Sequence, residues 1–275
     1  MSKNLAYFSS LSFGDLVIEL NFLEIEPTMV LITPAYNKSL LNALGYKGKV
    51  EYFQYPNTEI PPLFFNFKSA NYLGIISSFF LLRSAIIDYS KKFEIIFYES
   101  SWKWKLLSFG VSKCYLKSTS DNIYNSLINK YNLSFSLNKR KNSFTQNMVC
   151  SIFPDSRQLE KSIPTSSIEK IYCELLNYGF KVTVYTGREL KNNINHKNIA
   201  TLNELDDIIR SSNLCITADS MPLHLSYYRK IPVFVFAKKL NKILFPPTII
   251  VDEAWSNFYD TEKLKKWLDN YVIIF

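Results

Sequence analysis

The sequence predicts an α/β protein built from two Rossmann-like domains. Short apolar runs of strand length alternate with longer helical segments along both halves of the chain, which is the pattern of parallel sheets covered by helices. A polar and basic segment, residues 138–146, separates the two halves and has the composition of a linker. We therefore expect one domain over residues 1–142 and a second over residues 143–275.

Alternating elements fill the first half of the chain. Strands are expected where short apolar and β-branched runs lie between turn residues, at residues 5–10, 28–33, 50–55 and 93–98. Helices are expected where apolar residues recur at helical spacing or form a longer run, at residues 16–23, 36–44, 72–87 and 123–131. Gly45 is expected to end the second helix, because glycine readily adopts the left-handed conformation that closes a helix.

The most apolar run of the chain, residues 72–87, needs a separate interpretation. It is too short to span a bilayer, and it carries Arg83. The run therefore predicts a buried helix, and a helix that rests against a membrane surface is the alternative.

The second half repeats the alternation. Strands are expected at residues 148–153, 181–185, 199–201, 214–217 and 233–236. Helices are expected at residues 167–178, 202–210 and 261–271, and from Met221 onwards. In the helix at 202–210 the apolar positions share one face, so Asp206 and Asp207 are expected on the solvated face.

Composition and charge restrict the class of protein. An apolar content of 47% is enough for ordered cores, and the net charge of +8 suits anionic partners such as a membrane face or a phosphorylated glycolipid. No fingerprint of a nucleic-acid-binding domain is present, so no nucleic-acid partner is expected. The four cysteines lie far apart and the N-terminus lacks a signal-peptide pattern, so we expect free thiols, no metal site and a cytoplasmic protein.

Residues 212–237 form the most informative stretch. Two short apolar runs flank a polar turn and an amphipathic segment, which predicts strand, loop, helix and strand in a parallel crossover unit. Ser220 is an N-cap residue type and Pro222 suits the first helical turn, so free N–H groups would face the loop. Such a helix start favours an anionic ligand, although many capped helices bind nothing.

The segment from Asp219 to Leu225, DSMPLHL, resembles the donor-binding motif of glycosyltransferase family 9, the bacterial heptosyltransferase group. In that family the motif reads Asp-Ser/Thr-Gly-Pro-x-His-Leu and holds the diphosphate of a nucleotide sugar. The resemblance implies donor-binding roles for Asp219, Ser220, Met221 and His224. Met221 stands where the family has glycine, which lets a backbone approach a phosphate closely.

Weaker matches lie elsewhere at similar spacing. Gly14 and Asp15 follow the first strand, as a Gly-Asp pair does in the family, where the aspartate is the proposed catalytic base and Gly14 lies on the acceptor side. Ser156 and Lys161 match the start of the family's second domain, where the lysine holds donor phosphate. Asp155 replaces a family glycine there, and its negative charge beside a diphosphate would be unfavourable.

Three further residues are candidates from their place in the family pattern. The loop after the strand at 181–185 reaches the nucleoside in similar enzymes, sometimes through a carboxylate, and Glu189 is the candidate here. Trp102 and Trp104 fall near the acceptor cleft and could stack on a sugar, with burial in the core as the alternative.

The resemblance implies the GT-B fold, in which two Rossmann-like domains face each other across a cleft and the last helix crosses back to the first domain. It also implies an inverting glycosyltransferase without a metal or cofactor, which moves heptose or another hexose-type sugar from a nucleotide diphosphate donor. The expected acceptor is lipopolysaccharide or another glycolipid or oligosaccharide of the bacterial surface, reached at the inner membrane face. Two alternatives stay open: a non-catalytic relative that binds a nucleotide or glycan, and another sugar-nucleotide enzyme such as an epimerase or a hydrolase.

Overall fold

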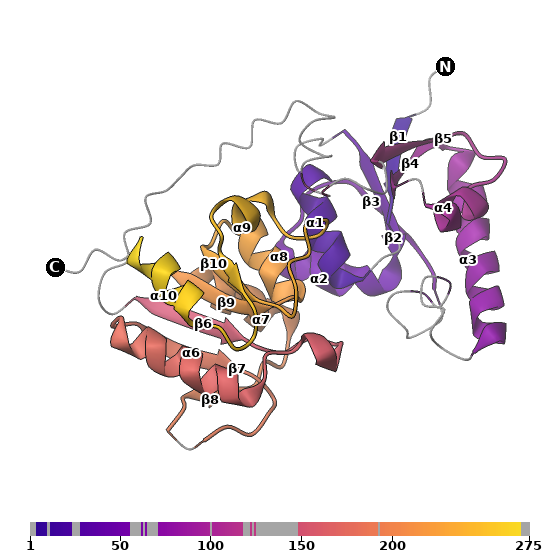
Figure 1. Cartoon of the computed structure of the whole chain (residues 1–275). Coiled ribbons are helices and arrows are strands. Elements are labelled where there is room, and N and C mark those ends of the chain that lie inside the picture. The colour runs from indigo at the N-terminus through magenta and orange to yellow at the C-terminus, as the bar shows by residue number, and fades with distance from the viewer. Residues whose placement is uncertain are drawn as a thin grey trace. The chain divides into compact units, whose positions relative to one another are not determined.

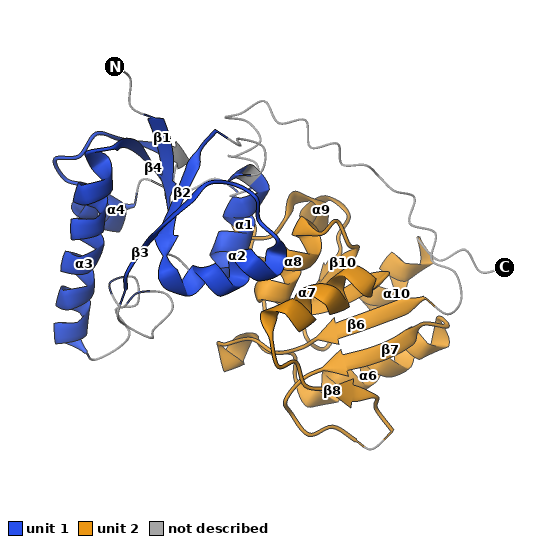
Figure 2. Cartoon of the chain, turned by 180° about the vertical axis from the view of Figure 1, so that it is seen from behind, with its two compact units in different colours: residues 1–133 blue, residues 134–275 orange. Residues whose placement is uncertain are grey.

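The computed structural model describes residues 4–9, 12–23, 28–55, 62, 64, 71–99, 101–117, 122, 124, 148–191 and 193–270. The chain divides into two compact units, residues 1–133 and 134–275 (Figure 2). Three expected features lie outside the described residues: the linker at 138–146, the domain boundary and, apart from Tyr124, the helix at 123–131. Two parallel α/β units confirm the predicted fold class.

Unit 1 is a five-stranded parallel sheet in the order β3-β2-β1-β4-β5. Its strands are β1 (Asn4–Phe8), β2 (Val30–Pro34), β3 (Val50–Phe53), β4 (Phe93–Glu99) and β5 (Lys113–Lys117). Its helices are α1 (Phe13–Leu23), η1 (Ala35–Asn37), α2 (Lys38–Leu44), α3 (Tyr72–Ser90) and α4 (Trp102–Leu107). Helices α1 and α2 cover one face of the sheet, and α3 and α4 cover the other (Figure 1). Gly45 ends α2 at φ 67°, as predicted.

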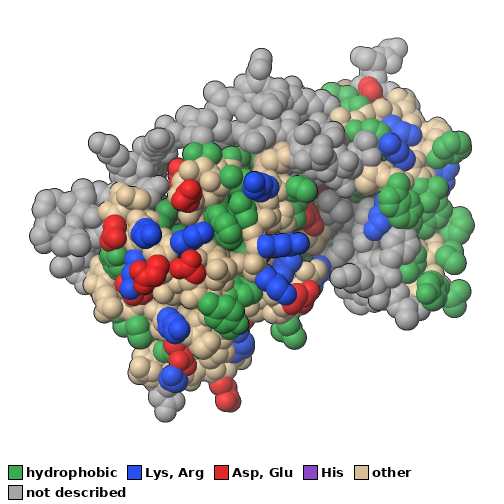
Figure 3. Space-filling model, viewed as in Figure 1, with side chains coloured by type: hydrophobic (Ala, Val, Ile, Leu, Met, Phe, Trp, Pro, Cys, Tyr) green, Lys and Arg blue, Asp and Glu red, His purple; other side chains and the backbone are tan. Residues whose placement is uncertain are grey.

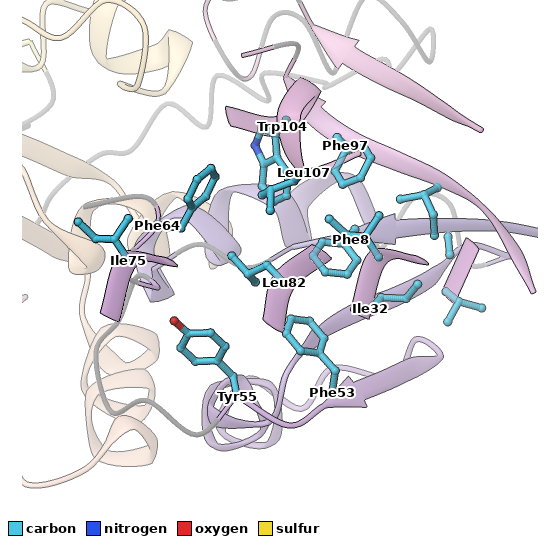
Figure 4. Close-up of a cluster of buried hydrophobic side chains, with 14 residues drawn as sticks. Phe8, Ile32, Phe53, Tyr55, Phe64, Ile75, Leu82, Phe97, Trp104 and Leu107 are labelled. Atoms are coloured by element: carbon cyan, nitrogen blue, oxygen red, sulfur yellow. The ribbon is translucent and has the colours of Figure 1, made fainter. Parts of the chain in front are cut away.

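The core under α3 and α4 is aromatic (Figure 4). Trp104 of α4 lies with its ring 4.9 Å from that of Phe97 and 6.1 Å from that of Phe8, which belong to neighbouring strands. Leu82 and Ile86 of α3 are fully buried in the same cluster. Each large ring removes much apolar surface from water, so this layer fixes both helices on the sheet.

Unit 2 is a six-stranded parallel sheet in the order β11-β10-β9-β6-β7-β8. Its strands are β6 (Val149–Phe153), β7 (Lys181–Tyr185), β8 (His196–Lys197), β9 (Leu214–Ala218), β10 (Val233–Phe236) and β11 (Trp255–Ser256). Its helices are η3 (Leu159–Lys161), α6 (Thr165–Asn177), α7 (Leu202–Ser211), α8 (Met221–Tyr228), α9 (Pro247–Val251) and α10 (Glu262–Asp269). The strand expected at 199–201 was misplaced, because the short strand β8 ends at Lys197.

Helices α7 and α8 are joined by a buried charge cluster that corrects one expectation. Asp206 is 2% exposed, not solvated, because the guanidinium of Arg229, the residue directly after α8, donates to both of its oxygens at 2.7 and 2.9 Å. Arg210 on the same helix lies 2.7 Å from Asp206 as well. Asp207 is exposed, as predicted.

The described part of the last helix, α10, packs on its own unit. Trp267 lies with its ring 5.5 Å from that of Phe234 on β10, and the Tyr178 hydroxyl after α6 donates to Asp269 at 2.6 Å. Residues 271–275 lie outside the described residues, so the expected crossing to the first unit stays a prediction.

Both sheets reverse their strand order at one point. In unit 1 the chain winds outward from β1 through β2 to β3 and then resumes at β4 on the other side of β1. In unit 2 the corresponding reversal lies between β6 and β9. In open parallel sheets the loops at the carboxyl ends of strands leave a crevice at such a reversal, and ligands bind there.

Candidate functional site

The reversal in unit 2 brings together two motifs that are distant in the sequence. Lys161 ends η3, which follows β6, and Asp219 follows β9. The Lys161 Nζ atom lies 2.8 Å from Asp219 Oδ2, although the two residues are 58 positions apart. The lysine side chain keeps 35% of its surface exposed and the aspartate only 13%, so the cation stays open to a ligand while the carboxylate holds it in place.

Ser220 occupies the start of α8, as expected from the sequence. It is the N-cap residue in an extended conformation, and Pro222 follows in the first turn. Its hydroxyl oxygen is buried and makes no hydrogen bond to any described residue. A buried hydroxyl without a partner is costly. In the first turn Pro222 has no N–H and the Leu223 N–H donates to the Ser220 carbonyl at 3.1 Å, which leaves the Met221 N–H and the Ser220 hydroxyl at the positive end of the helix dipole. This helix start therefore offers hydrogen-bond donors to an anion.

His224 lies one turn further along α8 and is 6% exposed. Burial lowers the pKa of its imidazole to about 4; the nearby Asp219 carboxylate opposes this shift and the Lys161 ammonium adds to it. The imidazole is therefore neutral near pH 7 and can donate one N–H without adding a charge. Lys161, Asp219 and His224 form one electrostatic cluster beside Ser220.

The negative charge of Asp155 is balanced by a cationic side chain in the structure. The Arg188 Nε atom lies 2.7 Å from Asp155 Oδ1, and the Thr186 hydroxyl donates to Asp155 Oδ2 at 2.7 Å. Arg188 also donates to the Ile163 carbonyl at 2.8 Å, which fixes the guanidinium in the loop. The expected repulsion between Asp155 and a diphosphate is reduced because the carboxylate already has a cationic partner. Neither Thr186 nor Arg188 was singled out from the sequence, although both follow directly after the predicted strand at 181–185.

Ser156 lies in the same loop and is half-buried. Its backbone N–H donates to the Ser162 hydroxyl at 2.9 Å, which closes the loop that contains η3. Its own hydroxyl accepts a long hydrogen bond of 3.4 Å from the Gln158 N–H. Ser156 therefore shapes the loop that carries Lys161.

A pocket of about 370 Å³ lies beside this cluster within unit 2. Its walls come from the ends of β6 and β7 and from the first turns of α7 and α8, and include Phe153, Tyr185, Asn198, Thr201 and Met221. The rings of Phe153 and Tyr185 stack at 5.4 Å. A mostly apolar pocket with a few polar groups suits a flat heterocycle.

Of the residues predicted from the sequence, Met221 lines this pocket and Glu189 does not. Met221 lies on the pocket wall, so its side chain occupies space that a family glycine would leave empty. Glu189 is exposed and does not line the pocket; the carboxylate on the wall belongs to Asp155. The expected nucleoside contact through Glu189 therefore stays a prediction.

Unit 1 places Asp15 in the first turn of α1, with Gly14 directly before it. The Ser12 hydroxyl donates to Asp15 Oδ2 at 2.5 Å, and the Ser12 backbone N–H does so at 3.3 Å. The bond from the Ser12 N–H is one half of a capping box, and the bond from the Ser12 hydroxyl holds the same carboxylate oxygen. The carboxylate is half-buried, so the cap orients a group that solvent still reaches.

A second acid in α1 was missed in the sequence. Glu19 lies one turn after Asp15 and is 2% exposed, and the Tyr7 hydroxyl donates to its Oε1 atom at 2.8 Å. Burial raises the pKa of Glu19 to about 8, and the neighbouring charge of Asp15 adds to the shift. Glu19 is thus a neutral acid near pH 7. Its position between Ile18 and Leu20, on the apolar face of the predicted helix, was the available signal.

The two tryptophans expected on the acceptor side have different environments. Trp102 is 59% exposed, and the Lys103 ammonium lies 5.9 Å from the centre of its ring. Trp104 is 2% exposed and belongs to the aromatic core, so it offers no surface to a sugar. That expectation is corrected for Trp104: two positions along a short helix turn the side chain from solvent to the sheet.

Two of the three cysteines of unit 2 behave as core residues, whereas Cys173 on α6 is exposed. Cys150 and Cys215 are fully buried on the neighbouring strands β6 and β9, as predicted. Burial raises the pKa of the Cys215 thiol to about 12. Within the described residues, no three His, Cys, Asp or Glu side chains are grouped as metal ligands.

Several solved structures have a fold similar to that of this chain. A glycosyl transferase family 9 protein from Veillonella parvula superposes with a TM-score of 0.61 at 13% identity, over 99% of this chain and 90% of its own. The Escherichia coli heptosyltransferase WaaC with ADP gives a TM-score of 0.63 at 10% identity, over 97% of this chain and 99% of its own. A UDP-N-acetylglucosamine 2-epimerase described as putative, from Listeria monocytogenes, gives 0.52 at 11% identity, over 98% of this chain and 88% of its own.

Comparison of sequences does not assign the chain to a family. No protein-family model matches the chain, and no curated protein matches its sequence. At these identities the structural likeness shows the fold, and the two-domain GT-B fold expected from the sequence is confirmed.

Proposed function

We propose that the protein is a glycosyltransferase that binds a nucleoside diphosphate sugar in unit 2 and transfers the sugar to an acceptor hydroxyl. The observation that carries this proposal is the cluster of Lys161, Asp219, Ser220 and His224 at the strand reversal of unit 2. It combines a cation, a helix start and a neutral N–H donor beside a pocket of nucleoside size. The solved structures of similar fold support it, since their descriptions name glycosyltransferases and, for WaaC, ADP.

The roles within the donor site follow from this geometry. The diphosphate is held by the Lys161 ammonium and the Met221 N–H at the start of α8, with the unpartnered Ser220 hydroxyl as a further donor. Asp219 holds Lys161 in place, and the neutral His224 contributes an N–H without repelling Lys161. The nucleoside occupies the pocket beside Phe153 and Tyr185. The sugar is heptose or another hexose-type sugar.

The transfer step needs a base and stabilisation of the leaving group. The acceptor oxygen forms a bond to the anomeric carbon while the bond from that carbon to the diphosphate breaks, and the configuration inverts. The acceptor proton passes to the Asp15 carboxylate, which Ser12 orients. The charge that develops on the diphosphate is stabilised by Lys161 and the α8 start. The residues of this chain thus supply the electrostatic stabilisation of the leaving group. The acceptor is a glycolipid or oligosaccharide of the bacterial surface, and the protein acts in the cytoplasm.

The first experiment is a thermal-shift screen of the purified protein against ADP, UDP, GDP and CDP and their sugar conjugates. A ligand at a hundred times its dissociation constant should raise the unfolding free energy by about 2.7 kcal/mol. Ser220→Ala is the most informative variant for ligand binding. It removes a buried hydroxyl without a partner and so should not destabilise the free protein. It should nevertheless reduce the shift given by the preferred nucleotide.

Lys161→Met tests the cation, and Lys170→Met is its matched control. Lys170 lies exposed on α6, away from the cluster. We expect Lys161→Met to weaken nucleotide binding by roughly ten- to a hundredfold and Lys170→Met to leave it unchanged. If no nucleotide stabilises the wild type, or if both lysine variants behave alike, the donor site is refuted.

An epimerase is the second candidate, since a protein described as a putative sugar-nucleotide 2-epimerase shares the fold. Incubation with the preferred nucleotide sugar separates the candidates. A transferase releases the nucleoside diphosphate only when acceptor is added, whereas an epimerase converts the donor without acceptor and a hydrolase releases free sugar. A non-catalytic relative binds the nucleotide and does none of these.

A further inference from the structure

Helix α3 of unit 1 is apolar on both of its faces. Its inner face, with Ile75, Leu82 and Ile86, is buried in the core of the unit. Its outer face repeats large apolar side chains at helical spacing, and they are exposed: Leu73 by 81%, Phe80 by 63% and Ile76 by 53%. A helix on the surface of a soluble protein normally presents polar residues outward. The expectation that this segment is too short to span a bilayer is corrected, because α3 extends over 19 residues and by length and composition alone could cross a membrane. Its inner face, however, is built into the sheet unit, which favours a helix that lies along a surface.

Helix α4 and the turn after it extend this surface. Arg83 of α3 donates to the carbonyl oxygens of Leu107 and Leu106 at 3.0 and 3.4 Å, which joins the two helices. Trp102 and Phe109 are 59% and 73% exposed. We call the following set the apolar face: Leu73, Ile76, Phe80, Ile87, Trp102, Leu106 and Phe109. Figure 3 shows hydrophobic side chains gathered over this part of unit 1.

The apolar face is bordered by positive charge. Residues 72–92 and 101–113 contain one acidic residue, Asp88, which pairs with Lys91 at 2.7 Å. The same segments contain six basic residues: Arg83, Lys91, Lys92, Lys103, Lys105 and Lys113. In Figure 3, Lys and Arg side chains lie beside the hydrophobic ones in this region. Burial of part of the Lys103 side chain lowers its pKa, which is consistent with a lysine stem that lies along apolar surface.

We propose that the apolar face and its basic border dock unit 1 on the surface of an anionic phospholipid bilayer. Apolar and aromatic side chains enter the boundary between headgroups and acyl chains, while the lysines and Arg83 meet anionic headgroups. A second copy of the chain fits less well, because a symmetric pairing of this face would bring two basic borders together. The proposal stands on unit 1 alone and does not depend on the donor site in unit 2.

A vesicle flotation assay with the full-length protein tests the docking. The vesicles consist of phosphatidylethanolamine with phosphatidylglycerol, and vesicles of phosphatidylcholine alone serve as the neutral comparison. The wild type should float with the anionic vesicles and much less with the neutral ones. The double variant Leu73→Ser/Phe80→Ser should lower binding by about tenfold or more, since it removes the two apolar side chains of α3 with large exposed surface.

The basic border has its own variant and controls. Lys103→Glu/Lys105→Glu should abolish the preference for anionic vesicles, and added salt should weaken wild-type binding in the same way. Val251→Ser/Tyr259→Ser changes two exposed apolar residues of unit 2, and Lys170→Glu/Lys266→Glu changes two exposed lysines there. Both control pairs should float like the wild type. Melting temperatures equal to that of the wild type show that each variant is folded.

Three results would overturn the proposal. The wild type does not float with anionic vesicles; it floats equally well when the apolar face is altered; or it forms a dimer in solution that Leu73→Ser/Phe80→Ser dissociates. The last result would assign the apolar face to a second copy of the chain. A failure of nucleotide binding would leave the vesicle result unaffected, so the two proposals fail separately.

Discussion

The two units share a parallel sheet covered by helices on both faces, yet they distribute charge in opposite ways. Among the ion pairs between described residues, unit 1 contains Lys91–Asp88 and the other seven lie in unit 2. In unit 1 an acid, Glu19, is buried in its neutral form while apolar side chains of α3 face outward. In unit 2 charges meet in pairs, and two of these pairs, Lys161 with Asp219 and Arg188 with Asp155, lie at the carboxyl edge of the sheet.

This difference indicates different ligands for the two units. Paired charges that remain partly exposed, such as Lys161 with Asp219, can exchange one partner for a soluble anion. An exposed apolar helix cannot serve that purpose, but it suits an amphiphilic surface. The same sheet architecture therefore carries two kinds of recognition, and four variants test the contrast.

The largest effect is expected from Asp15→Asn in unit 1. The amide keeps the size of the side chain and can still accept from Ser12, but it cannot take a proton from the acceptor. Turnover should fall by about 10²- to 10⁴-fold, while nucleotide binding in unit 2 stays unchanged. Steady-state kinetics together with the thermal-shift assay measure both quantities. Equal turnover in the variant and the wild type would remove Asp15 from the chemistry.

Glu19 should make the protein sensitive to alkaline pH. Its pKa is about 8 in the folded state and 4.5 as the ordinary value, so between these values the unfolded state has lost a proton that the folded state keeps. Stability therefore falls as pH rises through this window, by roughly 3 to 5 kcal/mol in total. Glu19→Gln should not lose stability in this way. The free energy of unfolding of the variant, relative to that of the wild type, should therefore rise between about pH 5 and about pH 8.5. Urea unfolding at both pH values tests this, with exposed Glu160→Gln as the control. A constant difference between wild type and Glu19→Gln would contradict it.

His224 should produce the opposite slope in unit 2. Its pKa is about 4 in the folded state and 6.5 ordinarily, so the unfolded state binds a proton first as pH falls. Stability is then lost between pH 6.5 and about 4, by roughly 2 to 4 kcal/mol. His224→Gln should lack this acid sensitivity, and exposed His196→Gln should keep it. Melting temperatures across this range measure the slope, and parallel curves for His224→Gln and the wild type would count against a buried neutral imidazole.

The smallest effect is expected from Leu73→Ser on the outer face of α3. The side chain is 81% exposed, so the free energy of unfolding in water should change by less than about 0.5 kcal/mol. Leu82→Ala, on the buried face of the same helix, should cost about 2 to 5 kcal/mol. Denaturant unfolding compares the two. A large loss for Leu73→Ser would mean that its side chain supports the folded unit, and would weaken the assignment of this face to a membrane.

Local patterns were sufficient for most of the elements. The apolar periodicity located β9 and α8, and the Ser-x-Pro sequence correctly located the start of α8. The strands β5 and β11 were not predicted, because β5 has a lysine at each end and β11 has only two residues. Such strands form because a neighbouring strand offers its backbone, which no local propensity records.

The sequence by itself determined what depends on neighbours in the chain. The alternation of strands and helices, the left-handed end of α2 at Gly45 and the helix start at Ser220 all follow from backbone conformation and side-chain spacing within a few residues. These local rules were enough to predict two α/β units and a candidate anion site.

The tertiary structure decided what depends on packing between distant segments. It paired Lys161 with Asp219 and Asp155 with Arg188, and it buried Trp104 while leaving Trp102 exposed. It also buried Glu19 and Asp206, the first neutral and the second paired with arginines. Burial and charge pairing depend on which surfaces meet when the sheets and helices pack, and that information is distributed over the whole chain.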